Sequence, residues 1–153
     1  MNHPNNYRNM NDLQRFLDAQ EMDYGQALSE IRHGRKRSHW IWYIFPQMKG
    51  LGVSYRSNYY GIQDRSEAEA YLAHPVLGGR LREITRALLE LPQELTARNI
   101  LGGIDAVKVR SCMTLFHELS HEQLFLDVLN RFYDGEKDPS TLDLLVEGSK
   151  TTS

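Results

Sequence analysis

The chain reads Ser38-His39-Trp40-Ile41-Trp42-Tyr43-Ile44-Phe45-Pro46 at its most apolar point. Six apolar and aromatic residues follow one another here, which fits either a buried strand or a fully buried helical turn. We predict a short helix, because the sequence on both sides has helical periodicity. Ser38 is then the N-cap, and Pro46 ends the helix by restricting the backbone of Phe45.

Helical periodicity precedes this stretch. From Asn11 to Ile31, apolar residues recur at a spacing of three and four, and Gly34 stands where a helix C-terminus favours glycine. The pattern predicts two short helices or one bent helix. Residues 1–10 are polar, rich in asparagine and without periodicity, so we expect a disordered tail there.

The sequence after the apolar stretch also lacks strand patterns. Residues 47–63 are rich in Gly, Ser, Asn and Tyr, which predicts a loop. Ser66-Glu67-Ala68-Glu69 then matches a capping box, and Pro75 is expected to end the helix that it starts. Apolar stripes of helical spacing follow over residues 77–91, 109–116, 124–132 and 142–146. We therefore predict an all-α fold, a single compact domain of six to eight short helices over residues 11–147, with a second disordered tail over 148–153.

Length and composition are those of one globular domain. The chain has 153 residues, of which 41% are hydrophobic, and a chain of this size buries a core without covalent staples. Its one cysteine, Cys112, excludes an internal disulfide and a multi-cysteine metal site. The N-terminus resembles no signal peptide, and no apolar run approaches the ~18 residues that span a bilayer. We expect a cytoplasmic protein with no membrane partner.

The formal net charge of −2 hides a segregation of charge. Residues 31–63 carry six basic side chains and no acidic one, whereas residues 118–147 carry eight acidic side chains and two basic ones. These segments are either solvated faces that attract each other, or the first of them contains an anion site. The near-neutral total and the lack of a recognition-helix pattern argue against a nucleic-acid partner.

A metalloprotease-like motif occurs at His117-Glu118-Leu119-Ser120-His121, which matches H-E-x-x-H. Zinc chemistry at this spacing needs one continuous helix through both histidines, and a third ligand. The apolar stripes before and after the motif are centred roughly 150° apart at 100° per residue, which predicts a break near Ser120. Ser120-x-x-Gln123 would then cap a new helix. We predict no metal site and no cofactor.

Five blocks of the chain resemble a known bacterial family. They are Leu13–Gln20, Gly34–Gln47, Gly50–Ser54, Ala70–Gly78 and Lys108–Phe116, within a match that runs from about residue 13 to 145. The family is the domain of unknown function numbered eighteen-ten, whose members are sometimes misnamed calpastatin. The resemblance implies a mostly α-helical single domain without an assigned activity, so it supplies no catalytic residues. The chain departs from the family pattern at Ile104-Asp105-Ala106, where the family has a Pro-Asp-Asp-like element, and the His117–His121 spacing is not part of that pattern.

The distinctive block around Ser38 combines cations, an imidazole, aromatic faces and an amide. If a helix starts at Ser38, its free N–H groups and the adjacent arginines form an anion site. The faces of the tryptophan rings could stack on a planar base, and His39 is the candidate acid–base group. Lys108 and Arg110, from the block Lys108–Phe116, could supply the other side of the pocket. The candidate ligand-binding residues are Arg35, Lys36, Ser38, His39, Trp42, Gln47, Lys108 and Arg110.

Structural roles explain the same residues. Trp40 and Trp42 could be core residues, His39 could be a structural histidine, and Arg35 with Lys36 could complement the dipole of the preceding helix. Two functions stay open. The first is binding, with or without processing, of a small anionic metabolite or nucleotide; the second is a non-catalytic protein-interaction module, including a homodimer held by the opposed charges. The sequence does not decide whether the protein is an enzyme.

Overall fold

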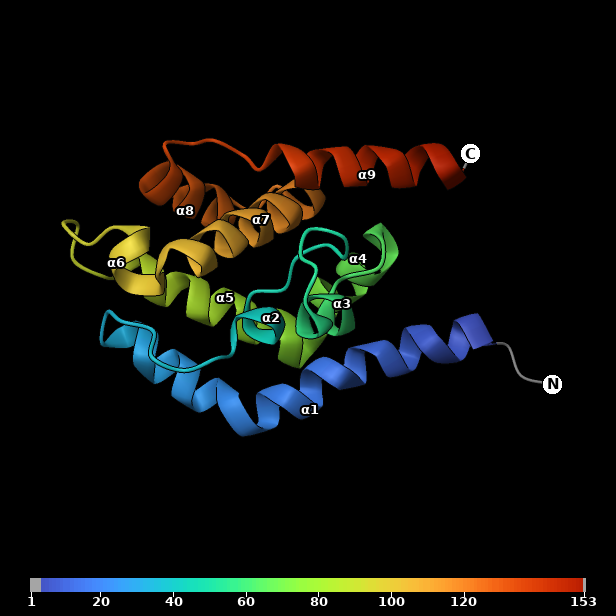
Figure 1. Ribbon diagram of the computed structural model, residues 1–153, viewed down its shortest axis with the longest axis horizontal. Coiled ribbons are helices and arrows are strands. Elements are labelled where there is room, and N and C mark those ends of the chain that lie inside the picture. Colours follow the sequence, from blue (N-terminus) through green and yellow to red (C-terminus); the bar gives the residue numbers. More distant parts are fainter. Residues whose placement is uncertain (1–3, 153) are drawn as a thin grey trace.

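A computed structural model describes the backbone of residues 4–152 and the side chains of residues 13–148 (Figure 1). The described part of the chain is helical, and its one β-type contact is an isolated bridge between Met48 and Ile62. The helices are α1 (Pro4–Arg32), α2 (Ile41–Ile44), α3 (Tyr55–Tyr60), α4 (Arg65–Ala73), α5 (Pro75–Leu89), α6 (Ala97–Leu101), α7 (Gly103–Ser120), α8 (Gln123–Tyr133) and α9 (Pro139–Thr152). The predicted all-α fold is confirmed. Six of the nine helices in the described range have nine residues or more, and α2, α3 and α6 are shorter.

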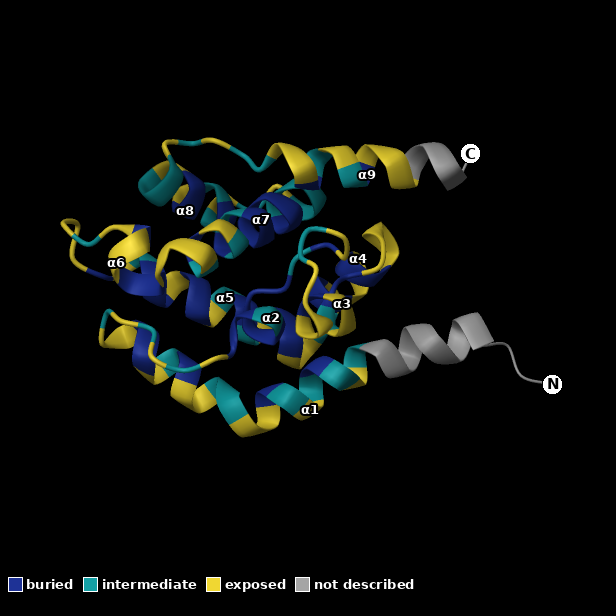
Figure 2. Ribbon diagram, viewed as in Figure 1, coloured by how far each residue is buried: buried dark blue, intermediate teal, exposed yellow. Residues whose placement is uncertain are grey.

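Helix α7 lies at the centre of the fold. It packs against α4, α6, α8 and α9, while α5 packs against α1, α4 and α8 (Figure 1). Six successive residues of α7, from Ser111 to Phe116, are buried, so neighbours cover this part of the helix on all sides (Figure 2). Helices α1 and α9 lie on opposite sides of the molecule. No helix in the described part of the chain is both long and apolar enough to span a bilayer.

Helix α1 is a single helix with a bend, one of the two forms that the sequence predicts (Figure 1). It ends where glycine was expected, because Gly34 adopts a φ of 81° and its N–H donates to the carbonyl of Ile31. The predicted tails, residues 1–10 and 148–153, lie mostly outside the described side chains and stay predictions, although the backbone of α1 and α9 runs into both ranges.

The helix predicted to start at Ser38 starts three residues later. Helix α2 has only four residues, its N-cap position is Trp40, and no side chain caps it. The segment before it has no regular structure, and Glu30 of α1 accepts hydrogen bonds from the N–H groups of Arg37 (2.8 Å) and Ser38 (3.0 Å). The predicted N-cap at Ser38 is therefore wrong, since Trp40 holds the N-cap position and the Ser38 hydroxyl donates to Glu30.

The carboxylate of Glu30 accepts two further hydrogen bonds from the same block. The Ser38 hydroxyl donates at 2.6 Å and the indole Nε1–H of Trp40 at 2.9 Å, while Gln26 donates from one turn earlier in α1. Glu30 is only 8% exposed. Burial by itself would raise the pKa of Glu30, but the hydrogen bonds from Ser38, Arg37 and Trp40 outweigh that effect and lower the pKa to about 2.

Lys36 connects this block to the other side of the fold. Its ammonium lies 2.8 Å from the carboxylate of Asp105 on α7 and 4.9 Å from the ring centroid of Trp40. Its backbone N–H donates to the carbonyl of Ile100 on α6. Residues 35–40 thus join α1 to α6 and α7, and the indole of Trp40 is buried beneath them.

The predicted loop over residues 47–63 contains a helix, α3, which Ser54 caps by accepting from the N–H of Ser57. The two ends of this segment are paired, since Lys49 donates to Ile62 and Ile62 donates to Gln47. A buried arginine on α1, Arg15, donates to the carbonyls of Tyr59 and Gly61 and forms a salt bridge with Glu67 on α4. The segment is therefore a fixed substructure and not a free loop.

Two predicted caps lie elsewhere. Helix α4 begins after Asp64, whose side chain accepts from the N–H of Glu67, so the proposed box at Ser66 is wrong. The predicted break near Ser120 is confirmed, because α7 ends there and His121 is left-handed with a φ of 58°. The capping box at Ser120 is not formed, since Glu122 precedes α8 and no side chain caps it.

The hydrogen bonds of Glu30 predict a large loss of stability on substitution. Glu30→Gln should lower the free energy of unfolding by about 2–4 kcal/mol, because the amide places a donor where Ser38 and Trp40 need acceptors. Urea denaturation measures this value. The matched control is Glu94→Gln, an exposed residue, for which a change within about 0.5 kcal/mol is expected.

The low pKa of Glu30 predicts a dependence of stability on acid. The pKa is about 2 in the folded chain against 4.5 for a free glutamate, so ionised Glu30 stabilises the fold fully above pH 4.5. As the pH falls from 4.5 to 2 this contribution, about 3 kcal/mol, is lost. The difference in unfolding free energy between wild type and Glu30→Gln should shrink accordingly; a difference that is the same at pH 6 and pH 3 would contradict the assignment.

Candidate functional site

The candidate residues from the sequence separate in the structure. Lys36 and Ser38 are engaged with Asp105 and Glu30, as described above. Arg110 is also engaged, because its guanidinium donates to the carbonyls of Glu136 and Lys137, both at 2.8 Å. It holds the connection between α8 and α9.

The neighbours of Arg110 have the same structural role. The hydroxyl of Ser111 donates to the carboxylate of Asp138 at 2.9 Å, and the hydroxyl of Thr114 accepts from the N–H of Asp138 at 2.9 Å. Asp138 in turn accepts from the N–H of Thr141 in the first turn of α9. The block Lys108–Phe116 therefore fixes the start of α9 through the face of α7 that carries Arg110, Ser111 and Thr114.

The anion site expected at Ser38 contains an anion of the chain itself. The N–H groups of Arg37 and Ser38 both donate to the carboxylate of Glu30. The sequence pattern correctly indicated backbone N–H donors that favour a negative charge. The group that supplies this charge is Glu30, eight residues upstream of Ser38, and no sequence motif indicated it. Arg35 and His39 are exposed, and neither lines the hollow described next.

Three of the candidate residues come together. Trp42 of α2, Gln47 after it and Lys108 of α7 line one hollow, with Phe45, Ser57, Tyr60 and Gly61. It offers only about 10 Å³ of room for water-sized groups, close to the minimum that holds one water molecule. The structure thus joins residues about sixty positions apart in the sequence at a shallow site.

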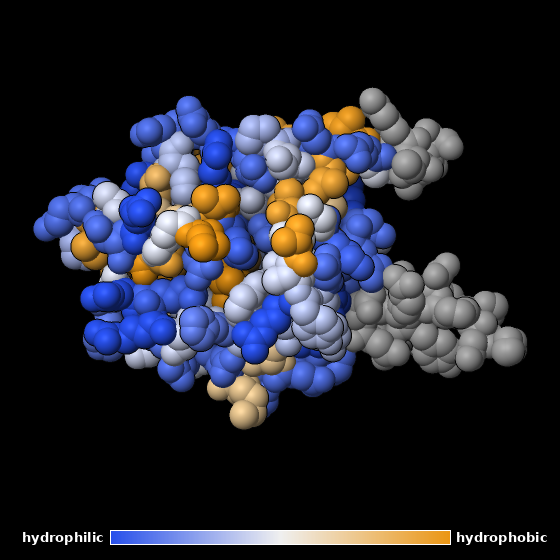
Figure 3. Space-filling view, viewed as in Figure 1, coloured by the Kyte–Doolittle hydropathy of each residue, from blue (hydrophilic) through white to orange (hydrophobic). Residues whose placement is uncertain are grey.

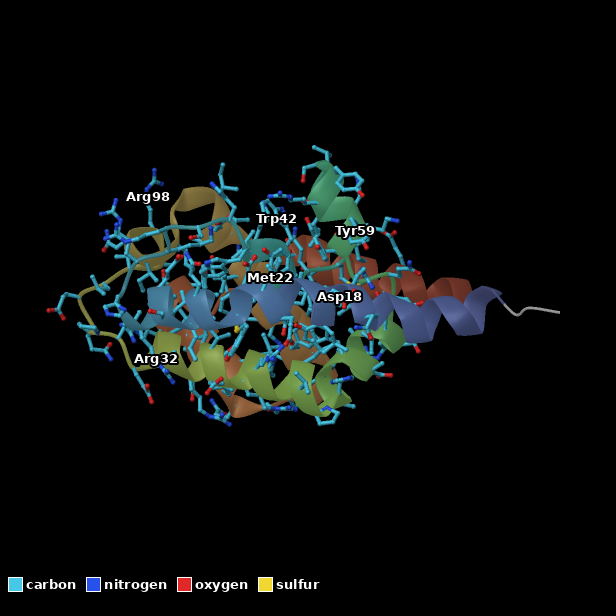
Figure 4. The ribbon with its side chains drawn as sticks, turned by 90° about the horizontal axis from the view of Figure 1, so that it is seen from below. Asp18, Met22, Arg32, Trp42, Tyr59 and Arg98 are labelled. Atoms are coloured by element: carbon cyan, nitrogen blue, oxygen red, sulfur yellow. The ribbon has the colours of Figure 1, made fainter. Side chains whose placement is uncertain are left out.

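The charged and aromatic groups at the hollow differ from those in the core. Trp42 is half-buried, whereas Trp40 is 1% exposed. The guanidinium of Arg56 lies 5.0 Å from the ring centroid of Trp42. Seen from below, Trp42 lies between Arg98 of α6 and Tyr59 of α3 (Figure 4). The structural and the functional interpretation therefore apply to different tryptophans. Trp40 is a core residue, and Trp42 is half-buried at the surface.

Lys108 has no partner of its own among the described residues. It is half-buried, and within residues 13–148 its ammonium forms no salt bridge and no hydrogen bond. The nearest acidic residue on the helix, Asp105, is paired with Lys36. The ammonium of Lys108 is therefore available to an anion from outside the chain.

Three exposed apolar side chains are neighbours in the sequence of residues that line or contact the hollow. Val53 is 96% exposed, Ile104 75% and Val107 62%. Figure 3 shows apolar side chains gathered on this face in two groups, over the beginning of α7 and over the segment before α3. We call the surface formed by Trp42, Val53, Arg56, Ile104, Val107 and Lys108 the front face. The sequence patterns did not indicate Val53, Arg56, Ile104 or Val107, although Ile104 and Val107 stand four and one residues before Lys108, a helical spacing that places them beside it.

The H-E-x-x-H motif is not on one continuous helix, because α7 ends at Ser120 and His121 follows in the left-handed conformation. The rings of His117 and His121 are 5.7 Å apart, and the carboxylate of Glu118 is bound to Lys137 at 2.6 Å. Burial lowers the pKa of His117, and the charge of Lys137 lowers it further. Within the described residues no three His, Cys, Asp or Glu side chains are grouped as metal ligands.

Two other features of the fold, a buried cysteine and a cavity, contain none of the predicted ligand-binding residues. Cys112 is fully buried, and burial raises the pKa of its thiol, so it is a core residue. A larger cavity of about 310 Å³ lies between α4 and α9, and its walls include Met48, Asp64 and Leu144. No candidate residue from the sequence lines this cavity.

Comparison with known proteins gives a structural relative and a family. The chain is similar to a crystal structure described as "the conserved hypothetical protein Rv1873 from Mycobacterium tuberculosis", with 42% identity and a TM-score of 0.86 over 88% of this chain and 96% of that one. A comparison with curated proteins gave no match. The model of the family described as "Protein of unknown function (DUF1810)" matches residues 10–145. The resemblance seen in the sequence blocks is thereby confirmed, and the chain belongs to this family.

Proposed function

We propose that the protein binds an anionic group at the hollow lined by Trp42, Gln47 and Lys108, carried on a ligand with a planar or apolar part. The observation that carries the proposal is the half-buried ammonium of Lys108, which has no counter-ion among the described residues. An ammonium without a counter-ion within the described part of the chain can form a charge-assisted hydrogen bond with an anion from solution.

The neighbours of Lys108 support an anion with an attached group. The guanidinium of Arg56 stacks on Trp42 and is a second cation next to the hollow. The side-chain amide of Gln47 can donate to an oxygen or accept from a nitrogen. The hollow is too small to enclose a metabolite, so one oxygen of the anion would enter it and the rest of the ligand would lie over Trp42. A phosphorylated or carboxylated small molecule, such as a nucleotide, has this chemistry.

Lys108→Met separates ligand binding from folding. Because Lys108 has no described partner, the substitution should change the stability of the free protein by no more than about 0.5 kcal/mol. Inorganic phosphate, citrate and adenosine monophosphate, each at low ionic strength, are the test ligands. We expect at least one of them to stabilise wild type, by about 1.4 kcal/mol at a concentration ten times its Kd, and to leave Lys108→Met unchanged.

Thermal unfolding measures both quantities. The matched control is Lys49→Met, which removes an exposed lysine that does not line the hollow and should keep the response of wild type. Equal stabilisation of wild type and Lys108→Met, or none by any of the three anions, would contradict the proposal. A lower melting temperature of ligand-free Lys108→Met would assign the lysine a structural role.

A further inference from the structure

We infer that the front face docks a partner protein through an acidic segment that also carries apolar side chains. The inference rests on the proposed anion site, because the carboxylates of the partner would occupy the place next to Lys108. It goes further by naming a carrier of the anion, which is an acidic segment of a partner protein.

The size of the hollow favours a partner over an enclosed small molecule. Pockets that enclose small ligands have volumes of ~300–1,000 Å³, whereas this hollow has about 10 Å³ of room. A small anion bound there would leave Val53, Ile104 and Val107 in water. Exposed apolar side chains gathered on one face are typical of protein-interaction sites, and a partner segment would cover all three.

The spacing on α7 fits a docked segment. Ile104, Val107 and Lys108 stand at positions i, i+3 and i+4, so they lie on one side of the helix. Val53, in the segment before α3, lies on the other side of the hollow, because Gly52 packs beside Gln47 and Ser57, which line it. Apolar side chains on both sides of the hollow, with Lys108 and Arg56 beside it, offer contacts to the apolar and acidic faces of an amphipathic segment.

The charge of the face selects an acidic partner. Residues 31–63 contain no acidic residue, so none lies next to Arg56 in the sequence, and Asp105 of α7 is turned away to Lys36. Lys108 and Arg56 would therefore meet carboxylates of the partner. Two cations among three exposed apolar side chains are too few for a nucleic-acid backbone, which is bound through many phosphate contacts.

The segment that carries Val53 is held in place. A Cβ on Gly52 would lie 2.5 Å from the hydroxyl oxygen of Ser57, which shows how closely the backbone packs there. Ser54 caps α3, and Arg15 binds the carbonyls at the other end of that helix. A surface that is ordered before binding loses little entropy on docking.

Nuclear magnetic resonance of the full chain tests the inference with three probes. They are a 15-residue acidic amphipathic peptide of Glu, Leu and Phe, the same peptide with Lys for Glu, and inorganic phosphate. The indole N–H of Trp42 reports on the front face, and that of Trp40, buried against Glu30, is the internal control. We expect the acidic peptide to shift the Trp42 indole signal and the methyl signals of Ile104 and Val107. The lysine peptide should shift none of them, and the affinity of the acidic peptide should fall at least five-fold between 0.05 M and 0.5 M salt.

Two variants separate the docking surface from the anion site. Ile104→Ser keeps Lys108 but removes exposed apolar surface, so it should weaken the acidic peptide about ten-fold and leave the response to phosphate unchanged. Lys108→Met should abolish both responses. Both positions are at the surface or without a described partner, and an unchanged melting temperature confirms that the variants fold.

The remaining outcomes of these experiments distinguish the docking inference from the proposed anion site. A response to phosphate without a response to millimolar acidic peptide overturns the docking inference and keeps the anion site. No response to either probe overturns both proposals. Signals of Trp42, Ile104 and Val107 that move with the concentration of the protein alone would identify a second copy as the occupant, which overturns the inference of an acidic partner.

Discussion

The carboxylate of Glu30 organises the part of the molecule that carries the candidate site. Four groups from residues 37–40 donate to it, so a segment without regular structure is fixed against α1. A buried charge is costly unless its hydrogen bonds are complete, and the low pKa of Glu30 shows that they outweigh the cost of burial. Without this carboxylate the backbone before α2 would lack its partners, and Trp40 would lose the acceptor for its indole N–H.

Fixing residues 37–40 also determines which tryptophan enters the core. Trp40 is pinned between Glu30 and Lys36, while Trp42, two residues later, is turned to the surface beside Arg56. Lys36 adds a link to Asp105, so the same segment ties α1 to α7. The position of Trp42 next to Lys108 thus depends on contacts made by neither residue.

Several polar residues of the family-like blocks form hydrogen bonds or salt bridges that connect elements of the fold. Arg15 binds α3 and α4, Lys36 binds α7, and Arg110 binds the connection before α9. Lys108 differs from these three residues, because it belongs to the same kind of block and is half-buried without a described partner. Arg35 and His39 also lack a described side-chain partner, but they are exposed. This contrast, and not charge or aromatic content by themselves, is the basis on which the front face is proposed as the functional surface.

The sequence by itself determined the fold class, the family and several boundaries. Periodicity at three and four residues depends on local backbone geometry, so it indicated the helices, the end of α1 at Gly34 and the break at Ser120. It also placed Trp42, Gln47 and Lys108 among the candidates. Only the tertiary structure decided which candidates meet. The partners of Lys36, Ser38 and Arg110 are Asp105, Glu30 and two backbone carbonyls, and these lie eight to sixty-nine positions away in the chain. Contacts over such distances follow from the packing of whole helices, which no local pattern encodes.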